Sequence, residues 1–132
     1  MELKREVVPP PAPGLDGSGN FDRPFSSVVR GGDFVFIGGL VSVDPQTGER
    51  RPGTVASETQ QILSNLRQLI EAAGSAMSKV VKVNVVLHSM LEAPNMNDVY
   101  MRFFPDPPPA RTVCGARLPD GVKVMIECTA LA

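Results

Sequence analysis

Two charged residues near the end of the chain have types and positions that could do chemistry. Arg111 follows three prolines and one alanine, and Glu127 comes later inside an apolar run. A guanidinium is permanently charged and can bind a carboxylate through two parallel hydrogen bonds. A carboxylate on a sheet can orient or deprotonate a water molecule. The pair could therefore hold a small carboxylic acid and hydrolyse it, and the alternative is a structural ion pair between neighbouring strands.

The bulk composition indicates one domain and argues against several classes of function. The chain has 132 residues, of which 42% are apolar and 20% are charged, as in an ordinary globular domain. The net charge is −1 and no cluster of lysine and arginine is present, so we expect no nucleic-acid partner. No apolar stretch is long enough to cross a bilayer, and the N-terminus is unlike a secretory signal. A cytoplasmic protein is therefore expected.

The cysteines and the single histidine do not indicate a metal site. Cys114 and Cys128 fall in expected strands and are interpreted as small, buried apolar residues of a reduced compartment. Together with His88 they do not make a convincing zinc-binding set, so we expect no metal.

Periodicity and turn residues divide the chain into a Pro/Gly-rich arm over residues 1–24, with no element of its own, and one domain over 25–132. Within the domain, apolar runs predict strands and apolar residues at helical spacing predict helices. The expected strands are 26–29, 34–41, 80–87, 111–117 and 122–130, and the expected helices are 54–73 and 96–104. The order β-β-α-β-α-β-β indicates an α+β fold with two helices on one face of a mixed sheet.

The longer helix is expected to cover the sheet with one side only. Thr54 or Ser57 can cap its start, and Ser57 with Gln60 makes a plausible capping box. Gly74 stands where a left-handed residue often ends a helix. Asn65 falls on the wetter side of the helix, away from its apolar stripe.

Alternation along the last strand predicts that the second face of the sheet needs a partner. Val124, Ile126 and Cys128 share one face, whereas Met125 and Glu127 share the other. Both faces of the sheet carry apolar residues, but two helices can cover only one of them. We therefore infer that the uncovered face meets another subunit.

With these elements in place, the chain resembles the Rid (YjgF-type) reactive-intermediate deaminase family. The resemblance covers roughly residues 24–132 and rests on several separate motifs in the family's order. These are Arg30-Gly31-Gly32-Asp33-Phe34-Val35-Phe36-Ile37, Asp44-Pro45-Gln46-Thr47-Gly48-Glu49, the run 59–74 with Asn65-Leu66, Val80-Val81-Lys82-Val83, the run 97–104, Pro109-Ala110-Arg111, Leu118-Pro119 and Ile126-Glu127.

The resemblance implies a homotrimer of chorismate-mutase-like subunits with a site in each intersubunit cleft. It also implies hydrolysis, without a cofactor, of 2-imino or enamine carboxylic acids to 2-keto acids and ammonia. By resemblance, Arg111 grips the substrate carboxylate and Glu127 positions the attacking water. The backbone N–H of Gly39 is an additional carboxylate donor, a backbone group around Val113 contacts the imino nitrogen, and Asn97 lies near the pocket.

Several residues depart from the family's pattern around this pocket. Phe25 stands where the family has a tyrosine whose hydroxyl reaches the pocket, and Ser27 replaces a glutamine. Gly38 and Leu40 replace a serine and a glutamine on either side of the backbone donor. These changes predict a more apolar cavity that keeps the cation and the carboxylate, and hence a shifted substrate or an altered reaction.

The segment from Arg111 to Pro119 is one residue shorter than is usual in the family. In a strand, such a change reverses the faces of the later side chains unless a bulge absorbs it, so the relative geometry of Arg111 and Glu127 is open. Cys114 could touch the pocket as a reactive thiol, with buried packing as the alternative. Two further functions stay open: a divergent Rid-like protein that binds or converts a reactive intermediate in a specialised biosynthetic pathway, and a non-catalytic trimeric binding or regulatory module.

Overall fold

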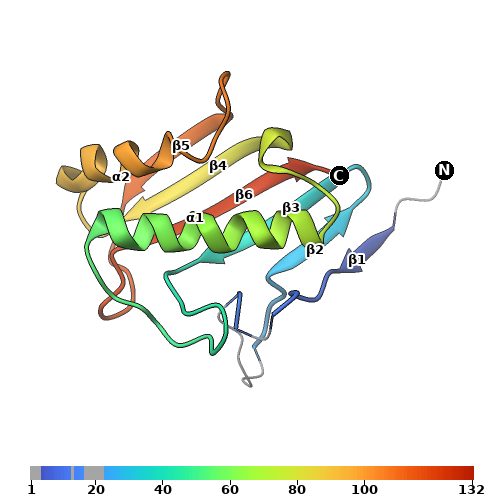
Figure 1. Ribbon diagram of the computed structural model, residues 1–132, viewed down its shortest axis with the longest axis horizontal. Helices are drawn as coiled ribbons and strands as arrows, with labels where there is room; N and C mark the ends of the chain where they lie inside the picture. Colours follow the sequence, from blue (N-terminus) through green and yellow to red (C-terminus); the bar gives the residue numbers. More distant parts are fainter. Residues whose placement is uncertain (1–3, 13, 17–22) are drawn as a thin grey trace.

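A six-stranded mixed sheet carries two α-helices on one face (Figure 1). The computed structural model describes residues 4–12, 14–16 and 23–132, and in this part of the chain the strand order is β1-β2-β3-β6-β4-β5. Neighbouring strands are antiparallel except β4 and β5, which run parallel. The elements are β1 (Arg5–Val7), β2 (Val28–Gly31), β3 (Phe34–Leu40), α1 (Val55–Ala72), β4 (Val80–Leu87), α2 (Ala93–Tyr100), β5 (Ala110–Gly115) and β6 (Val124–Leu131). The expected α+β fold is confirmed, with one strand more than expected at its N-terminal side.

Helix α1 begins at a reciprocal cap. The Thr54 hydroxyl accepts a hydrogen bond from the Ser57 backbone N–H, and the Ser57 hydroxyl accepts one from the Thr54 backbone N–H, both at 3.0 Å. The expected capping box of Ser57 with Gln60 is therefore wrong, because Ser57 is the third helical residue and not the cap. Gly74 follows the helix in the left-handed region, at φ 85°, as expected. No helix in the described ranges is long and apolar enough to cross a membrane.

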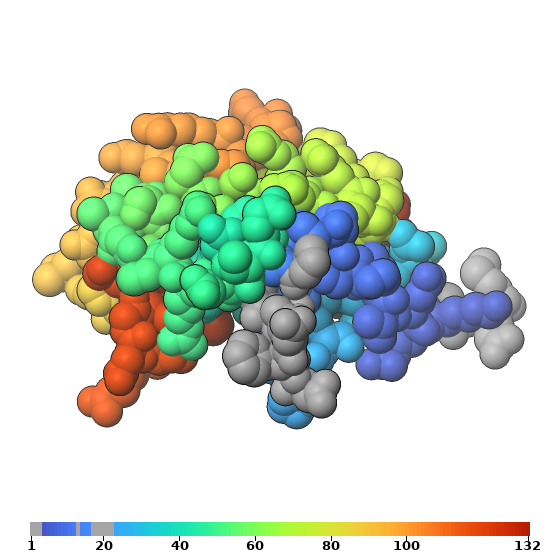
Figure 2. All heavy atoms as spheres, turned by 60° about the horizontal axis from the view of Figure 1, so that its bottom comes forward, coloured from blue at the N-terminus to red at the C-terminus, as the bar shows by residue number. Residues whose placement is uncertain are grey.

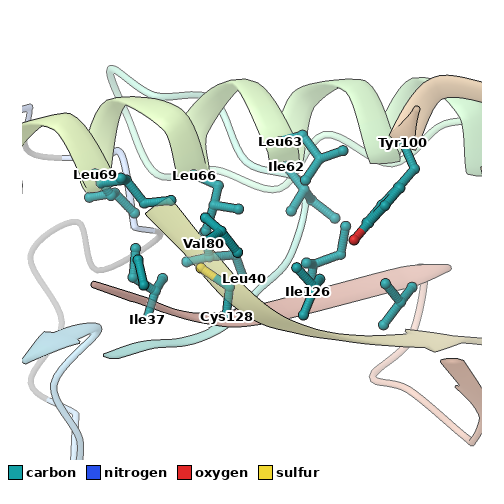
Figure 3. Packing of buried hydrophobic residues seen from close by; sticks show 14 of the residues in the cluster. Ile37, Leu40, Ile62, Leu63, Leu66, Leu69, Val80, Tyr100, Ile126 and Cys128 are labelled. Atoms are coloured by element: carbon teal, nitrogen blue, oxygen red, sulfur yellow. The ribbon is translucent and has the colours of Figure 1, made fainter. Parts of the chain in front are cut away.

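The core lies between α1 and the covered face of the sheet. Figure 3 shows Ile62, Leu63, Leu66 and Leu69 pointing from the helix toward side chains of β3, β4 and β6. The α1 stripe that the sequence predicted is buried as expected. The prediction was wrong for one polar residue of the helix: Asn65 was expected to be solvent-exposed, but it is only 1% exposed. It is buried because its amide donates to the Val43 carbonyl at 3.1 Å, which satisfies the side chain inside the fold.

The N-terminal segment is partly built into the sheet, contrary to the expectation of an arm without elements. Strand β1 pairs antiparallel with β2, from Arg5 opposite Gly31 to Val7 opposite Val29. Leu15 is fully buried in the core. Figure 2 shows this blue segment packed beside the cyan-green segment that follows β3. The prolines that argued against an element come after β1, and three residues at a sheet edge need no periodic pattern. The rest of the expected arm, residues 1–3, 13 and 17–22, lies outside the described residues.

The boundaries around the second helix differ from the sequence prediction. Helix α2 spans Ala93–Tyr100 rather than 96–104, and a 3-10 turn over Met90–Glu92 takes up part of the expected loop. Pro94 is tolerated in the first turn because the N–H that it lacks would have no partner within the helix. Strand β5 ends two residues earlier than expected, at Gly115 instead of 117, and β6 is shifted by up to two residues, to Val124–Leu131.

No helix or strand among the described residues covers the face of the sheet opposite the helices. Along β6, burial alternates as predicted, with Ile126 buried and Glu127 exposed. On β3, Phe34 and Phe36 are 41% and 47% exposed. Their side chains alternate with the buried Val35 and Ile37, so the open face carries large apolar groups next to polar ones.

Candidate functional site

Arg111 is held at the start of the edge strand β5. It pairs with Val83 of β4, whose side chain is buried under the helices, so Arg111 belongs to the helix-covered face. Its Nη1 donates to Oδ1 of Asn97 on α2 at 2.7 Å. Its guanidinium carbon lies 4.7 Å from the centre of the Tyr100 ring, which is a cation–π contact. The structure thus brings Arg111 and Asn97 together, as the sequence predicted.

The guanidinium stands at the edge of a largely apolar pocket of about 610 Å³. The walls come from α2, the turn after it and the proline segment. They are Asn97, Tyr100, Met101, Phe104, Pro105, Asp106, Pro108, Pro109 and Arg111. Among the described residues, no carboxylate forms an ion pair with Arg111. The cation is therefore fixed in position and available to an anion from outside the chain.

Tyr100 forms a rigid platform beneath this cation. Its ring packs against Phe104 with centroids 4.6 Å apart, and the residue is 4% exposed. Figure 3 shows its hydroxyl directed toward the sheet, and within the described ranges this hydroxyl has no hydrogen-bond partner. Burial raises the pKa of Tyr100 to about 12, although the Arg111 charge acts in the opposite direction. The phenol is therefore neutral at physiological pH, and Tyr100 contacts the guanidinium through its aromatic ring and not through a charged oxygen.

Glu127 lies on the other, open face of the sheet. It pairs with Asn84 of β4, whose Nδ2 donates to Oε1 of Glu127 at 2.8 Å. A second pocket, of about 310 Å³, surrounds this carboxylate and includes Ser26, Gly38 and Lys82. The amide of Asn84 fixes the orientation of one carboxylate oxygen and leaves the other available to a water molecule.

A β-bulge faces Glu127 from β3. Ile37 pairs with Cys128 and Leu40 pairs with Ile126, so Gly38 and Gly39 together stand opposite the single residue Glu127. A Cβ atom at Gly39 would lie 2.8 Å from Sδ of Met125, so a larger residue there would displace this methionine. The structure thus places the bulge glycines opposite Glu127, on the face of the sheet away from Arg111 of the same chain.

Arg111 and Glu127, which the sequence suggested as one pair, do not meet within one chain. Across neighbouring strands, Arg111 is paired with Val83, and Val83 is paired with Cys128. Glu127 is paired with Asn84, the next residue of β4, so the side chains of Arg111 and Glu127 emerge on opposite faces of the sheet. Strand β4 separates their strands, which excludes the alternative of an ion pair between neighbouring strands. The candidate site therefore consists of two halves: the cation half around Arg111 and Asn97, and the carboxylate half around Glu127 and Gly38–Gly39.

Three further candidates lie in neither pocket. Phe25 is 59% exposed, and the Arg23 guanidinium carbon is 4.5 Å from its ring centre. Val113 is partly buried against the core on the Arg111 face. Cys114 is exposed, so the expectation that both cysteines are buried is wrong for it. It lies on the edge strand β5, where only one neighbouring strand covers it.

The other cysteine, Cys128, behaves as the sequence predicted. It is buried in the core under α1 (Figure 3). Burial, with a smaller contribution from the Glu127 charge, raises the pKa of this thiol to about 12. The thiol is therefore protonated and serves packing.

Sequence reasoning missed the polar partners on β4. Lys82 donates from Nζ to Oγ1 of Thr112 at 2.7 Å, and Asn84 holds Glu127. The polar side of β4 was visible in the alternation of Lys82 and Asn84 with buried valines. If β4 had been expected next to β6, this alternation would have placed Lys82 and Asn84 on the same face of the sheet as Glu127.

The fold and the site define a class of small α+β proteins: a mixed sheet with two helices on one face, an exposed cation and a carboxylate opposite a β-bulge. Comparisons with known proteins identify the family within this class. A family model described as endoribonuclease L-PSP matches residues 20–132. A 2-iminobutanoate/2-iminopropanoate deaminase of Dermatophagoides farinae is 37% identical over 128 residues, covering 96% of this chain and 95% of that protein.

Two solved structures have the same fold. RidA from the Antarctic bacterium Psychrobacter superposes with a TM-score of 0.83 at 29% identity, covering 96% of this chain and 99% of that one. TdcF of E. coli with bound serine gives a TM-score of 0.80 at 30% identity, covering 96% and 98%. The chain belongs to the Rid (YjgF-type) family, as the motifs in the sequence indicated.

Proposed function

We propose that the protein hydrolyses a 2-imino or enamine carboxylic acid to a 2-keto acid and ammonia. The observation that carries this proposal is the fixed guanidinium of Arg111, which has an apolar pocket beside it and no carboxylate ion pair among the described residues. A relative of similar length is named as a deaminase of 2-iminobutanoate and 2-iminopropanoate, and both of those names describe carboxylates. The serine in the TdcF structure is a carboxylate as well.

The chemistry needs little more than orientation, because a protonated imine is already electrophilic. Arg111 would bind the substrate carboxylate in bidentate fashion. Glu127 would take a proton from water while the water oxygen bonds to the imine carbon and the C=N π electrons move to nitrogen. The proton then passes to the nitrogen, the C–N bond breaks, and the hydroxyl proton is lost. The sum is iminium acid plus water giving 2-keto acid plus ammonium.

The two halves would form one site between copies of the chain. Within one chain they face opposite sides of the sheet, whereas the exposed apolar residues of the open face favour a second copy there. In a closed trimer, each interface would place the Arg111 half of one chain against the Glu127 half of its neighbour. Asn84 is then a positioning residue, since it acts through Glu127.

The activity can be measured with 2-iminopropanoate generated in place by an amino-acid oxidase. Residual imine is trapped with semicarbazide and read by absorbance. We expect the purified protein to speed the loss of imine and Arg111→Ala to lose at least about nine-tenths of this effect. Equal rates with and without the protein would contradict the proposal.

Mixing two strongly impaired variants tests which chain supplies each half of the site. Arg111→Ala and Glu127→Gln chains are refolded together in equal amounts. If each site takes its cation and its carboxylate from different chains of a trimer, random mixing restores about a quarter of the wild-type activity. If both come from one chain, the mixture stays as impaired as either variant alone.

The description of the family model also names an endoribonuclease. The net charge of −1 gives an RNA backbone no general attraction to this chain. We therefore place deamination first and propose no role in RNA cleavage.

A further inference from the structure

We propose that the pocket beside Arg111 selects monocarboxylates with a bulky apolar side chain, an aromatic ring above all. The inference rests on the proposed function in taking Arg111 as the carboxylate anchor. It goes further by naming the part of the ligand that lies next to that anchor.

The anchor fixes where the carboxylate must sit. Asn97 holds one side of the guanidinium at 2.7 Å and the Tyr100 ring supports its face at 4.7 Å. With the side chain pinned at two points, little conformational freedom is left to lose when a ligand binds. The ligand's second group is therefore presented to a defined wall and not to open solvent.

That wall is apolar and made of rings. Pro105, Pro108 and Pro109 contribute flat, stiff surfaces, and the largely buried Tyr100 and Phe104 contribute the part of each ring that stays exposed. These rings need no reordering to receive another ring, and aromatic edges pair favourably with the face of an aromatic ligand. A proline-and-aromatic wall of this kind fits a phenyl or branched aliphatic group better than a polar one.

The volume of the pocket favours a large group over a small one. At about 610 Å³, the cavity is in the range of pockets that hold drug-sized ligands. The methyl group of a 2-iminopropanoate would touch a small part of it, whereas a benzyl group would remove much more apolar surface from water.

Asp106 adds discrimination by charge. Among the described residues that line the pocket, it is the one carboxylate. A second carboxylate on the ligand would meet it as a like charge, while the first is satisfied by Arg111. The pocket should therefore disfavour dicarboxylates such as a 2-iminoglutarate.

Binding of two stable carboxylates tests the inference without any reaction. Propanoate and 3-phenylpropanoate differ only by the phenyl ring, and their dissociation constants are measured by NMR titration of the full-length protein. We expect 3-phenylpropanoate to bind at least about tenfold more tightly. Arg111→Ala should weaken both ligands.

A matched pair of variants locates the selectivity. Met101 is exposed and lines the pocket, and Leu91 is exposed on the surface and does not line it. Met101→Glu should remove the preference for the phenyl compound, and Leu91→Glu should keep it. Equal affinities of the two ligands for the wild-type protein, or a preference that survives in Met101→Glu, would overturn the inference.

The imine assay separates this outcome from the proposed function. Hydrolysis of 2-iminopropanoate with no phenyl preference in binding would leave the deaminase intact and refute the side-chain pocket. A phenyl preference that depends on Met101, with no hydrolysis of any imine, would refute the deaminase and leave the pocket's selectivity standing.

Discussion

Arg111 and Glu127 lie on opposite faces of one sheet, with β4 between the strands that carry them. The side chain beside Arg111 in the register, Val83, is buried under the helices, and the one beside Glu127, Asn84, is on the open face. A substitution in one half-site should therefore leave the geometry of the other half in the same chain unchanged. The effects of substitutions in the two halves can therefore be measured separately.

Arg111→Ala should lower kcat/KM for imine hydrolysis about tenfold to a hundredfold, because a charge-assisted hydrogen-bonding anchor is lost. Arg111→Lys should recover only part of this loss, since an ammonium cannot form the planar bidentate contact. Thermal unfolding serves as the control, and we expect the melting temperature of both variants to stay near the wild-type value because the residue is exposed. A large loss of stability would assign Arg111 a structural role.

Glu127→Gln should lower kcat about a hundredfold or more with a small change in KM, since the amide keeps the shape but cannot accept the water proton. Asn84→Ala should have a weaker effect of the same kind, because it releases one oxygen of the carboxylate. Steady-state kinetics on the same imine measure both. An Asn84→Ala variant that changes only KM would contradict a positioning role through Glu127.

Gly39→Ala should lower the free energy of unfolding by about 1–2 kcal/mol, because its Cβ would press on the Met125 side chain. The matched control is Gly38→Ala, where the nearest atoms to a Cβ lie at an ordinary 3.8 Å. Adding Met125→Ala to Gly39→Ala should recover part of the loss. Urea titrations of the wild type, Gly39→Ala, Met125→Ala and the double variant give the coupling energy, and additivity of the two changes would refute the contact.

Glu58→Ala should lower the free energy of unfolding by about 2–4 kcal/mol. The carboxylate is 1% exposed and accepts from the backbone N–H groups of Gly53 at 3.1 Å and Lys123 at 3.0 Å, which tie together two distant loops. Glu71→Ala, on the exposed side of the same helix, should change stability by less than about 0.5 kcal/mol. Chemical denaturation measures both, and equal effects would contradict the prediction.

Stability should fall above pH 10 because of Tyr100. Its pKa is about 12 in the folded protein and near 10.0 ordinarily, so the unfolded chain gives up this proton first. The unfolded state is therefore stabilised relative to the folded state as the pH rises. The loss is complete above the folded pKa, and Cys128, whose pKa is also raised to about 12, acts in the same direction from about pH 9. Tyr100→Phe should flatten the curve of unfolding free energy against pH in this window. At pH 7 it should cost little, because the hydroxyl has no hydrogen-bond partner among the described residues.

The sequence was a good guide wherever neighbouring residues decide the structure. Strand β4 has the predicted limits, 80–87, and the apolar stripe of α1 is buried as expected. Both patterns repeat within a few residues, so the local periodicity contains the information. The buried Asn65 and Glu58 were misplaced or missed because their partners, Val43 and Lys123, are far away in the sequence.

The candidate site was predictable in its residues and not in its arrangement. Arg111, Asn97, Glu127 and Gly39 were each named from sequence motifs. The structure brings Arg111 to Asn97 and places Gly39 opposite Glu127, whereas the expected pair of Arg111 and Glu127 is apart within one chain. Arg111 and Glu127 lie on opposite faces because of the register between the parallel strands β4 and β5. This register depends on the whole connection from β4 through α2 to β5. A shift of one residue in that register would move Arg111 to the other face, and no local pattern fixes it.

The family match begins at residue 20, but the folded unit reaches back to β1 and Leu15. Cutting the chain at that boundary would remove a core side chain and leave the outer edge of β2 with unpaired backbone groups. Bare strand edges recruit strands from other molecules, which is a common route to aggregation. The N-terminal segment would then decide whether the protein can be concentrated and stored. A shortened form should therefore be tested for aggregation by light scattering before its reaction rate is measured.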